Sequence, residues 1–268
     1  MTTFDAARHV RQALDSLRTQ TFQDFEVLVV DDGSTDGTLE AVRGCGDPRV
    51  RLVQVPRQGR IPCLNHGFRT ARAPLVAIQD ADDVSLPDRL RLQVAEMARR
   101  PALAVLGAGI VPQIDDAGQP LDTRTRPVGA RKVRRELARG MALFPSSALY
   151  RKAAWEEAGG FDERLPCWED YDMCVRLAAR HEVDNLPVAL GMKRRHPGQA
   201  FDAMHFTSAG YRTRARIVVR YVLHVRPDPV ALARAGAYLL MGPRLRLAWL
   251  RLTRRDPAEV ALASKPRA

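Results

Sequence analysis

The stretch "FEVLVVDDGSTDGTLEAVRGC" (residues 25–45) carries the signals that decide the fold. It opens with a nearly continuous apolar run that ends at Asp31 and Asp32, and it returns after a polar turn as a helical pattern over 37–45. A run that is apolar at consecutive positions is typical of a strand buried on both faces, as in parallel sheets covered by helices. The stretch therefore predicts a strand, a turn and a helix, which is the repeating unit of an α/β fold.

The neighbouring segments continue this alternation. Apolar residues at helical spacing predict helices over 6–19 and 61–72, and apolar runs predict strands over 50–55 and 74–80. We expect an α/β fold with a mostly parallel sheet flanked by helices. Only "MTTF" precedes the first helix, so the sheet is expected to lack the first strand that such a helix normally follows.

Acidic residues follow two of the predicted strands at the point where each strand ends. Asp31 and Asp32 end the first, and "LVAIQDADDVSLPDRL" (75–90) places Asp80, Asp82 and Asp83 after the other. The carboxyl ends of parallel strands meet at one edge of a sheet, where ligands bind. Carboxylates this close repel one another, so water or a cation must neutralise them. The structural alternative is a solvated, Asp-rich turn.

The composition predicts a folded, cytoplasmic protein. Hydrophobic residues make up 46% and charged residues 27% of the 268 residues, and neither a secretory signal nor an apolar run of about 18 residues is visible. The four cysteines form no C-x-x-C pair and have no histidine at ligand spacing, which argues against zinc. Gly44-Cys45-Gly46 lacks the third glycine of a dinucleotide-binding fingerprint, which excludes that class.

Positive charge is concentrated at the end of the chain. From His205 onward, thirteen Lys and Arg residues stand against three Asp and Glu, so this part carries +10 of the net charge of +11. We therefore expect one folded domain over 1–204 and a basic, helical C-terminal extension over 205–268.

The extension contains two segments with helical apolar spacing and many arginines, 212–226 and 230–255, the second broken by Pro243. The segments either lie on an anionic membrane surface or pack their apolar faces on the domain over 1–204, and the sequence supports both equally. No recognition motif for nucleic acid accompanies the charge, so no specific nucleic-acid partner is expected.

Several motifs, taken in order, resemble the family 2 glycosyltransferases with the GT-A fold. They are "TTFDAARHVRQALDSLRTQTFQDFEVLVVDDGSTDGT" (2–38), "QDADD" (79–83) and "WEDYDMCVRL" (168–177). The resemblance covers roughly residues 1–200. It implies an enzyme that transfers a sugar from a nucleotide-sugar donor with inversion of the anomeric carbon, and it carries almost no information on the substrate.

The resemblance also implies a donor-binding set. Thr2 and Phe4 match a turn that contacts the nucleotide base, with Phe4 in place of the usual Tyr. Asp32 matches the residue that accepts a base N–H, which suits uracil and favours a UDP-sugar. Arg60 follows the third element and is a candidate to place positive charge near the diphosphate, the alternative being an exposed surface arginine.

The departing diphosphate of such a donor needs neutralisation, which a hard divalent cation, Mg²⁺ or Mn²⁺, provides with few protein carboxylates. The resemblance implies that Asp82 or Asp83 contacts the metal while the other contacts the donor ribose. Asp80 is the third candidate in this loop.

Inverting transfer also needs one general base opposite the leaving group. Asp170 matches the base of the family, and Glu169 is the second choice; the structural alternative is that Asp170 caps the helix that follows. Trp168 offers an aromatic face for a sugar, and Ser146 and Ser147 are candidates to line the acceptor pocket.

The sequence thus predicts an inverting, metal-dependent glycosyltransferase that uses a glycan or lipid-linked acceptor in cell-surface polysaccharide or glycolipid synthesis. We expect it in the cytoplasm, with peripheral binding to the inner face of the plasma membrane through 205–268. One rival is a nucleotidyltransferase, which usually carries a Gly-rich phosphate loop that is not visible here. The other is an inactive, membrane-associated scaffold with the same fold.

Overall fold

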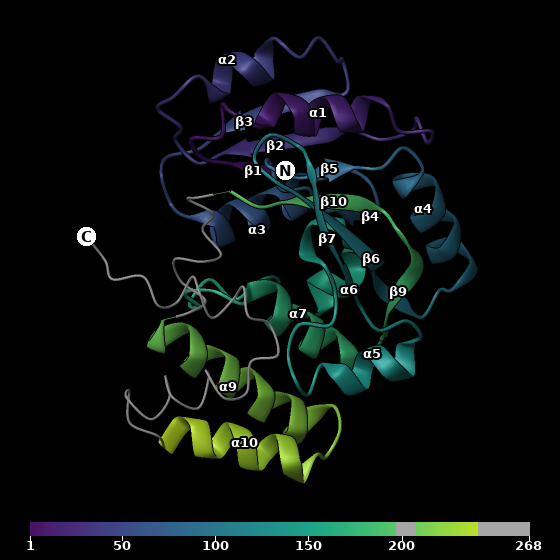
Figure 1. Cartoon of the computed structure of the whole chain (residues 1–268), viewed down its shortest axis with the longest axis vertical. Coiled ribbons are helices and arrows are strands. Elements are labelled where there is room, and N and C mark those ends of the chain that lie inside the picture. The colour runs from purple at the N-terminus through teal and green to yellow at the C-terminus, as the bar shows by residue number, and fades with distance from the viewer. Residues whose placement is uncertain (197–206, 241–268) are drawn as a thin grey trace.

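A computed structural model describes residues 1–196 and 207–240 of the chain (Figure 1). The first sheet forms around β2 (Val27–Asp31), and all five of its residues are buried. β1 (Thr2–Thr3) and β3 (Val50–Gln54) pair with β2 on its two sides, and both run parallel to it. The apolar run in the sequence therefore forms the central strand of a parallel sheet, as predicted.

Helices cover both faces of this first sheet: α1 (Val10–Arg18), α2 (Thr38–Arg43) and α3 (Arg60–Thr70). Because side chains alternate along a strand, Val27 and Val29 pack with the apolar side of α1, whereas Leu28 and Val30 pack with Cys63 of α3. This two-sided burial explains why β2 is apolar at consecutive positions.

The structure corrects the expectation that the first strand is absent. Thr2 and Thr3 form β1, a short strand whose residues lie opposite Val30 and Asp31 of β2. Thr2 also forms an isolated parallel bridge to Asp80, so β1 lies between β2 and the acidic loop. A two-residue strand has no apolar pattern to reveal it, which is why the sequence did not predict it.

A second sheet of seven strands, counted within the described residues, is built around the long strand β6 (Leu103–Ile114). Its other members are β4 (Leu75–Ala77), β5 (Val84–Ser85), β7 (Pro120–Thr125), β8 (Leu149–Arg151), β9 (Glu182–Ala189) and β10 (Gly191–Arg194). β9 and β10 run parallel to β6, whereas β7 and β8 run antiparallel to it. The predicted α/β class is confirmed, and the parallel order is complete only in the first sheet.

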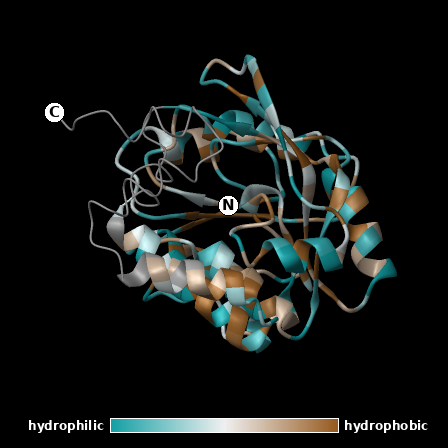
Figure 2. Ribbon diagram, turned by 60° about the horizontal axis from the view of Figure 1, so that its bottom comes forward, coloured by the Kyte–Doolittle hydropathy of each residue, from teal (hydrophilic) through white to brown (hydrophobic). Residues whose placement is uncertain are grey.

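The main apolar core lies between the second sheet and its helices. The aromatic rings of Phe68, Tyr150, Trp155 and Phe161 contact one another at its centre. Figure 2 shows hydrophobic residues along the central strands, while the outer helices carry both hydrophobic and hydrophilic residues. The remaining helices of this part are α4 (Arg89–Arg99), α5 (Ala130–Glu136), the 3₁₀ helix η1 (Pro145–Ser147), α6 (Lys152–Glu157) and α7 (Glu169–Ala178).

The first part of the basic extension folds onto this core. α9 (Ser208–His224) packs between α7 and α10 (Pro229–Leu240) (Figure 1). It buries Tyr211, Ile217, Val218 and Tyr221 in the main apolar cluster, so the packing alternative holds for α9. Pro243 and residues 241–268 lie outside the described residues. Within the part of the chain that the structure describes, no helix is both long and apolar enough to cross a membrane.

Candidate active site

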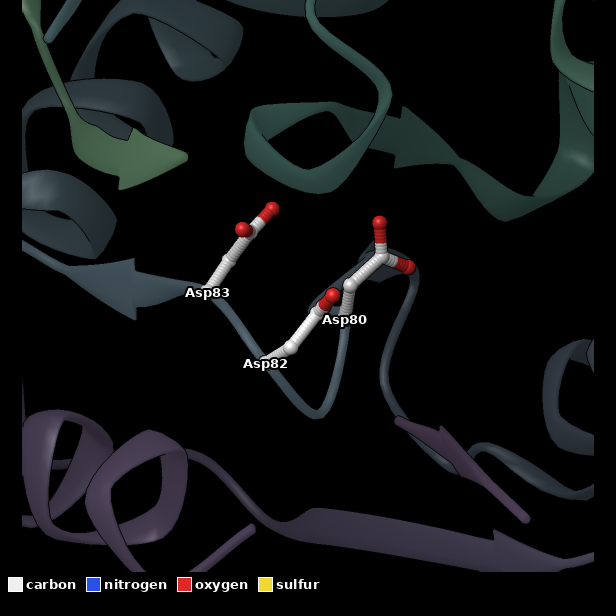
Figure 3. A group of neighbouring side chains, drawn as sticks. All are labelled: Asp80, Asp82 and Asp83. Atoms are coloured by element: carbon white, nitrogen blue, oxygen red, sulfur yellow. The ribbon is translucent and has the colours of Figure 1, made fainter. Parts of the chain in front are cut away.

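Three carboxylates meet at the carboxyl edge of the sheets, on the loop between β4 and β5. Asp80, Asp82 and Asp83 each place one carboxylate oxygen within 4.8 Å of the others. Figure 3 shows the three side chains extending from one turn toward the same side. Burial, and then the negative charges of Asp82 and Asp80, raise the pKa of Asp83 well above its usual range.

This donor set fits a hard divalent cation. Mg²⁺ and Mn²⁺ bind carboxylate oxygens, and a cation held among these three side chains would relieve the repulsion that crowding creates. Asp80, Asp82 and Asp83 are therefore the residues that could hold it.

Buried polar side chains hold the acidic loop in shape. The Gln79 amide donates hydrogen bonds to the backbone carbonyls of Asp80 and Asp83, at 3.0 and 2.9 Å. Arg89, which is fully buried, donates to Gln79 Oε1 at 2.8 Å and to the Ile78 carbonyl at 2.6 Å. The loop is thus fixed by the interior of the protein.

β10 braces the loop from the other side through Arg194, in contacts that the sequence did not predict. Its backbone N–H donates to Asp83 Oδ1 at 2.8 Å, and its guanidinium donates to the carbonyls of Asp82, Asp115 and Asp116 at 2.9–3.0 Å. His196, two residues further on, lies 3.1 Å from Asp82 Oδ2. Arg194 lies 111 positions from Asp83 and 78–79 positions from Asp116 and Asp115, so no local pattern could have revealed these contacts.

The donor-side residues predicted from the sequence lie beside β1. Asp32 is buried, and its carboxylate accepts hydrogen bonds from the backbone N–H of Gln58 at 2.7 Å and of Gly59 at 3.0 Å. Arg57, another residue that the sequence did not indicate, donates to Asp32 at 2.9 Å and stacks its guanidinium 3.2 Å from the centre of the Phe4 ring. The structure therefore brings Asp32 and Phe4 together through Arg57.

Arg60 connects the acidic loop with the predicted base. Its guanidinium donates to Asp80 at 3.0 Å, to Glu169 at 3.0 Å and to the Thr2 hydroxyl at 3.3 Å, and it lies 3.9 Å from Asp170. Burial lowers the pKa of Arg60, but the three carboxylates outweigh it and raise this pKa well above its usual value. The structure thus places Arg60 between Asp80 of the acidic loop and the carboxylates at the start of α7, and not on the open surface.

The buried carboxylate of Asp170, the predicted base, has unusual surroundings. The residue is 9% exposed, and its Oδ1 has no hydrogen-bond partner among the described residues. Burial, and then the neighbouring Glu169, raise the pKa of Asp170 to about 8. A carboxylate with a pKa near neutral pH and an oxygen without a hydrogen-bond partner has the properties of a general base.

The capping alternative for Asp170 is wrong. Trp168 is the N-cap residue of α7, and no side chain forms a capping hydrogen bond there. Asp170 is the second helical residue and lies in the first turn, where the helix dipole favours negative charge.

The acceptor candidates differ in their surroundings. Trp168 is half-buried, has a left-handed backbone with φ of 68°, and contacts the Tyr171 ring edge to face. The Ser146 hydroxyl accepts a hydrogen bond from the backbone N–H of Asp80 at 3.1 Å, so it touches the acidic loop. The buried Ser147 hydroxyl contacts the backbone of Ala108 and Phe144, and the structure does not bring it to the surface of the site.

The fold and this site define a glycosyltransferase of the GT-A type. The family model described as "Glycosyl transferase family 2" matches residues 1–159, and the chain belongs to this family. The amylovoran biosynthesis glycosyltransferase AmsE of Erwinia amylovora is 28% identical over 186 residues, which cover 68% of this chain and 69% of AmsE.

Two solved structures share the fold. S. aureus TarS in complex with UDP-GlcNAc superposes with a TM-score of 0.69 at 20% identity, covering 98% of this chain and 77% of TarS. The mannosyltransferase PcManGT from Pyrobaculum calidifontis, in complex with GDP-Man and Mn²⁺, superposes with a TM-score of 0.62 at 22% identity, covering 98% of this chain and 77% of PcManGT.

Proposed function

We propose that this glycosyltransferase is an inverting, metal-dependent enzyme that transfers a sugar from a nucleoside-diphosphate donor to an acceptor hydroxyl. The observation that carries the proposal is the buried carboxylate of Asp170: its Oδ1 has no hydrogen-bond partner among the described residues, and it lies near the acidic loop through their shared partner Arg60. One base and one group of cation ligands at the same edge of the sheets are the parts that single-displacement transfer needs.

In the proposed reaction, Asp170 takes the proton of the acceptor hydroxyl as its oxygen attacks the anomeric carbon. The new C–O bond forms on the face opposite the bond to the diphosphate, which breaks and releases the nucleoside diphosphate, so the anomeric configuration inverts. A divalent ion bound at Asp82 and Asp83 would supply neutralising charge for the departing diphosphate. Arg60 adds a positive charge between Asp170 and the acidic loop.

The donor proposal rests on the neighbours and on the residues beside β1. TarS binds UDP-GlcNAc, and PcManGT binds GDP-Man with Mn²⁺. We propose a UDP-sugar as the favoured donor, with Thr2, Phe4 and Asp32 near the nucleoside, Arg60, Asp80 and Asp82 near the ribose and diphosphate, and Mg²⁺ or Mn²⁺ as the ion.

The acceptor proposal is a glycan or lipid-linked hydroxyl in cell-surface polysaccharide or glycolipid synthesis, with Trp168 and Ser146 on the acceptor side. Its support is the name of AmsE, a glycosyltransferase of amylovoran biosynthesis. We further propose that the enzyme works in the cytoplasm and that the extension 205–268 binds anionic lipid, because its net charge is +10 and Val230 on α10 is 61% exposed.

The test is donor turnover by the purified chain with a panel of UDP- and GDP-sugars, Mn²⁺ or Mg²⁺, and Asp170→Asn as the comparison. Release of nucleoside diphosphate that requires both the ion and Asp170 is the expected result. Release of pyrophosphate from a nucleoside triphosphate would identify the rival nucleotidyltransferase. Donor binding without turnover of any donor would favour the scaffold.

A further inference from the structure

α7 presents an electrostatic problem at its first turn. Glu169, Asp170 and Asp172 place three carboxylates within four positions, and all three residues are buried. Trp168 enters this turn in a left-handed conformation, which is costly for a residue with a side chain. A turn of this kind keeps its shape only if neighbouring elements hold it.

Arg60 supports the first turn of α7 by pairing with Glu169, and it lies 3.9 Å from Asp170. A second set of contacts supports the turn through Asp172, whose side chain is 1% exposed. Asp172 Oδ2 accepts from Arg176 Nε at 2.7 Å, and Arg176 in turn donates to the Ala158 carbonyl at 2.5 Å. The second oxygen, Oδ1, accepts from Arg220.

Arg220 belongs to α9, which the sequence assigned to a separate extension. α9 reaches the catalytic domain at further points beside this contact: the Tyr221 hydroxyl donates to the Arg134 carbonyl at 2.6 Å, and the Arg214 guanidinium donates to the Arg139 carbonyl. Tyr221 itself is fully buried. These contacts fix α9 on the domain, so the Arg220 guanidinium has a defined position under the first turn of α7.

We propose that Arg220 is a positioning residue for the catalytic base: by pairing with Asp172 it fixes the first turn of α7, and with it Asp170, against the acidic loop. This inference rests on the proposed role of Asp170. Under this proposal α9 contributes to catalysis, although it lies beyond the residues that the family model matches.

The proposal predicts a specific pattern for Arg220→Gln. The turn should open more often, so peptides covering 166–178 should exchange amide hydrogen faster than in wild type. Turnover of the best donor should fall by about ten- to a hundredfold in kcat, the loss expected when a catalytic group is misplaced, with donor KM unchanged. Arg216→Gln is the matched control, because Arg216 lies one turn earlier on α9 and is exposed.

A second set of variants separates positioning from loss of folding. Arg220→Lys keeps the charge beside Asp172 and should restore part of kcat, and the melting temperature of each variant shows whether α9 stays folded. Because Asp172 and Arg220 act through one contact, combining Asp172→Asn with Arg220→Gln should lower kcat little more than the larger single change does. Full additivity of the two losses would overturn the proposal.

Two other results would also overturn it: unchanged hydrogen exchange over 166–178 in Arg220→Gln, or faster exchange with an unchanged kcat. The exchange measurement does not depend on turnover. If wild type and Asp170→Asn were equally inactive, the proposed function would fail while the contact between α9 and α7 would still be judged by exchange.

Discussion

The two acidic groups of the site contain the same residue type in opposite settings. The loop carboxylates of Asp80, Asp82 and Asp83 converge on one point, and backbone and side-chain donors from β10 and α4 support the loop around them. Asp170 instead lies buried in a helix turn, with one oxygen that forms no hydrogen bond to a described residue. The first arrangement concentrates negative charge for a cation, whereas the second raises the proton affinity of a single carboxylate. We therefore propose that the surroundings of each aspartate decide whether it acts as a ligand or as a base.

The largest effect is expected from removing the base. Asp170→Asn should lower the transfer rate by about 10²–10⁴-fold, the contribution typical of a general base, while donor binding stays the same. Transfer rates with a UDP-sugar and calorimetric titration of UDP measure the two effects. Asp122→Asn, at an exposed position on β7, is the control. A variant that keeps wild-type turnover would remove Asp170 from the base role.

A smaller effect is expected from removing one loop carboxylate. Asp82→Asn should raise the Mn²⁺ concentration needed for half-maximal turnover by about 10–100-fold, because one ligand of the cation is lost. A chelator should abolish turnover of the wild-type enzyme, and added Mn²⁺ should restore it. Asp88→Asn, just beyond the loop and paired with Arg91, should leave the requirement unchanged. An identical Mn²⁺ requirement in Asp82→Asn and wild type would show that the loop binds no catalytic cation.

The third prediction concerns pH. Because burial and Glu169 raise the pKa of Asp170 to about 8, kcat/KM should increase with pH and level off above about pH 8, as the base becomes deprotonated. A pH profile from 6 to 9.5 measures this, and a midpoint near 4 would contradict it.

The raised pKa of Asp170 also makes the stability of the folded protein depend on pH: stability should fall as pH rises, whereas kcat/KM should increase. Between about pH 4 and 8 the folded protein binds more protons at Asp170 than the unfolded chain does, so this residue lowers stability as pH rises. Asp170→Asn should therefore be more stable than wild type above pH 8, by about 1–2 kcal/mol, as measured by denaturant unfolding.

The sequence predicted the acidic loop well because its signal is local. Asp80, Asp82 and Asp83 lie within four positions of one loop after β4, so the chain itself brings them together. The contacts of the bracing residues could not be predicted in this way: Arg194 meets Asp83 across 111 positions, and Arg60, although a candidate from the sequence, meets Glu169 across 109. The pairing of Arg220 with Asp172 is equally non-local, because it depends on how α9 packs. Residue type and local order therefore indicate the candidate reacting groups, while the contacts that tune them follow only from the packed structure.

The smallest expected effect tests whether the two acidic groups are coupled. Arg60 lowers the pKa of Asp170, opposing burial and Glu169, and it also pairs with Asp80. In Arg60→Gln, the midpoint of the pH profile should therefore move above that of wild type. Turnover at pH 7 should fall by about three- to tenfold beyond any change seen at pH 9.5, because less Asp170 is deprotonated. Arg57→Gln is the control, since Arg57 pairs with Asp32 and should leave the midpoint in place. A midpoint that stays in place or moves to lower pH in Arg60→Gln would mean that the loop and the base titrate independently, and that Arg60 acts only on the donor side.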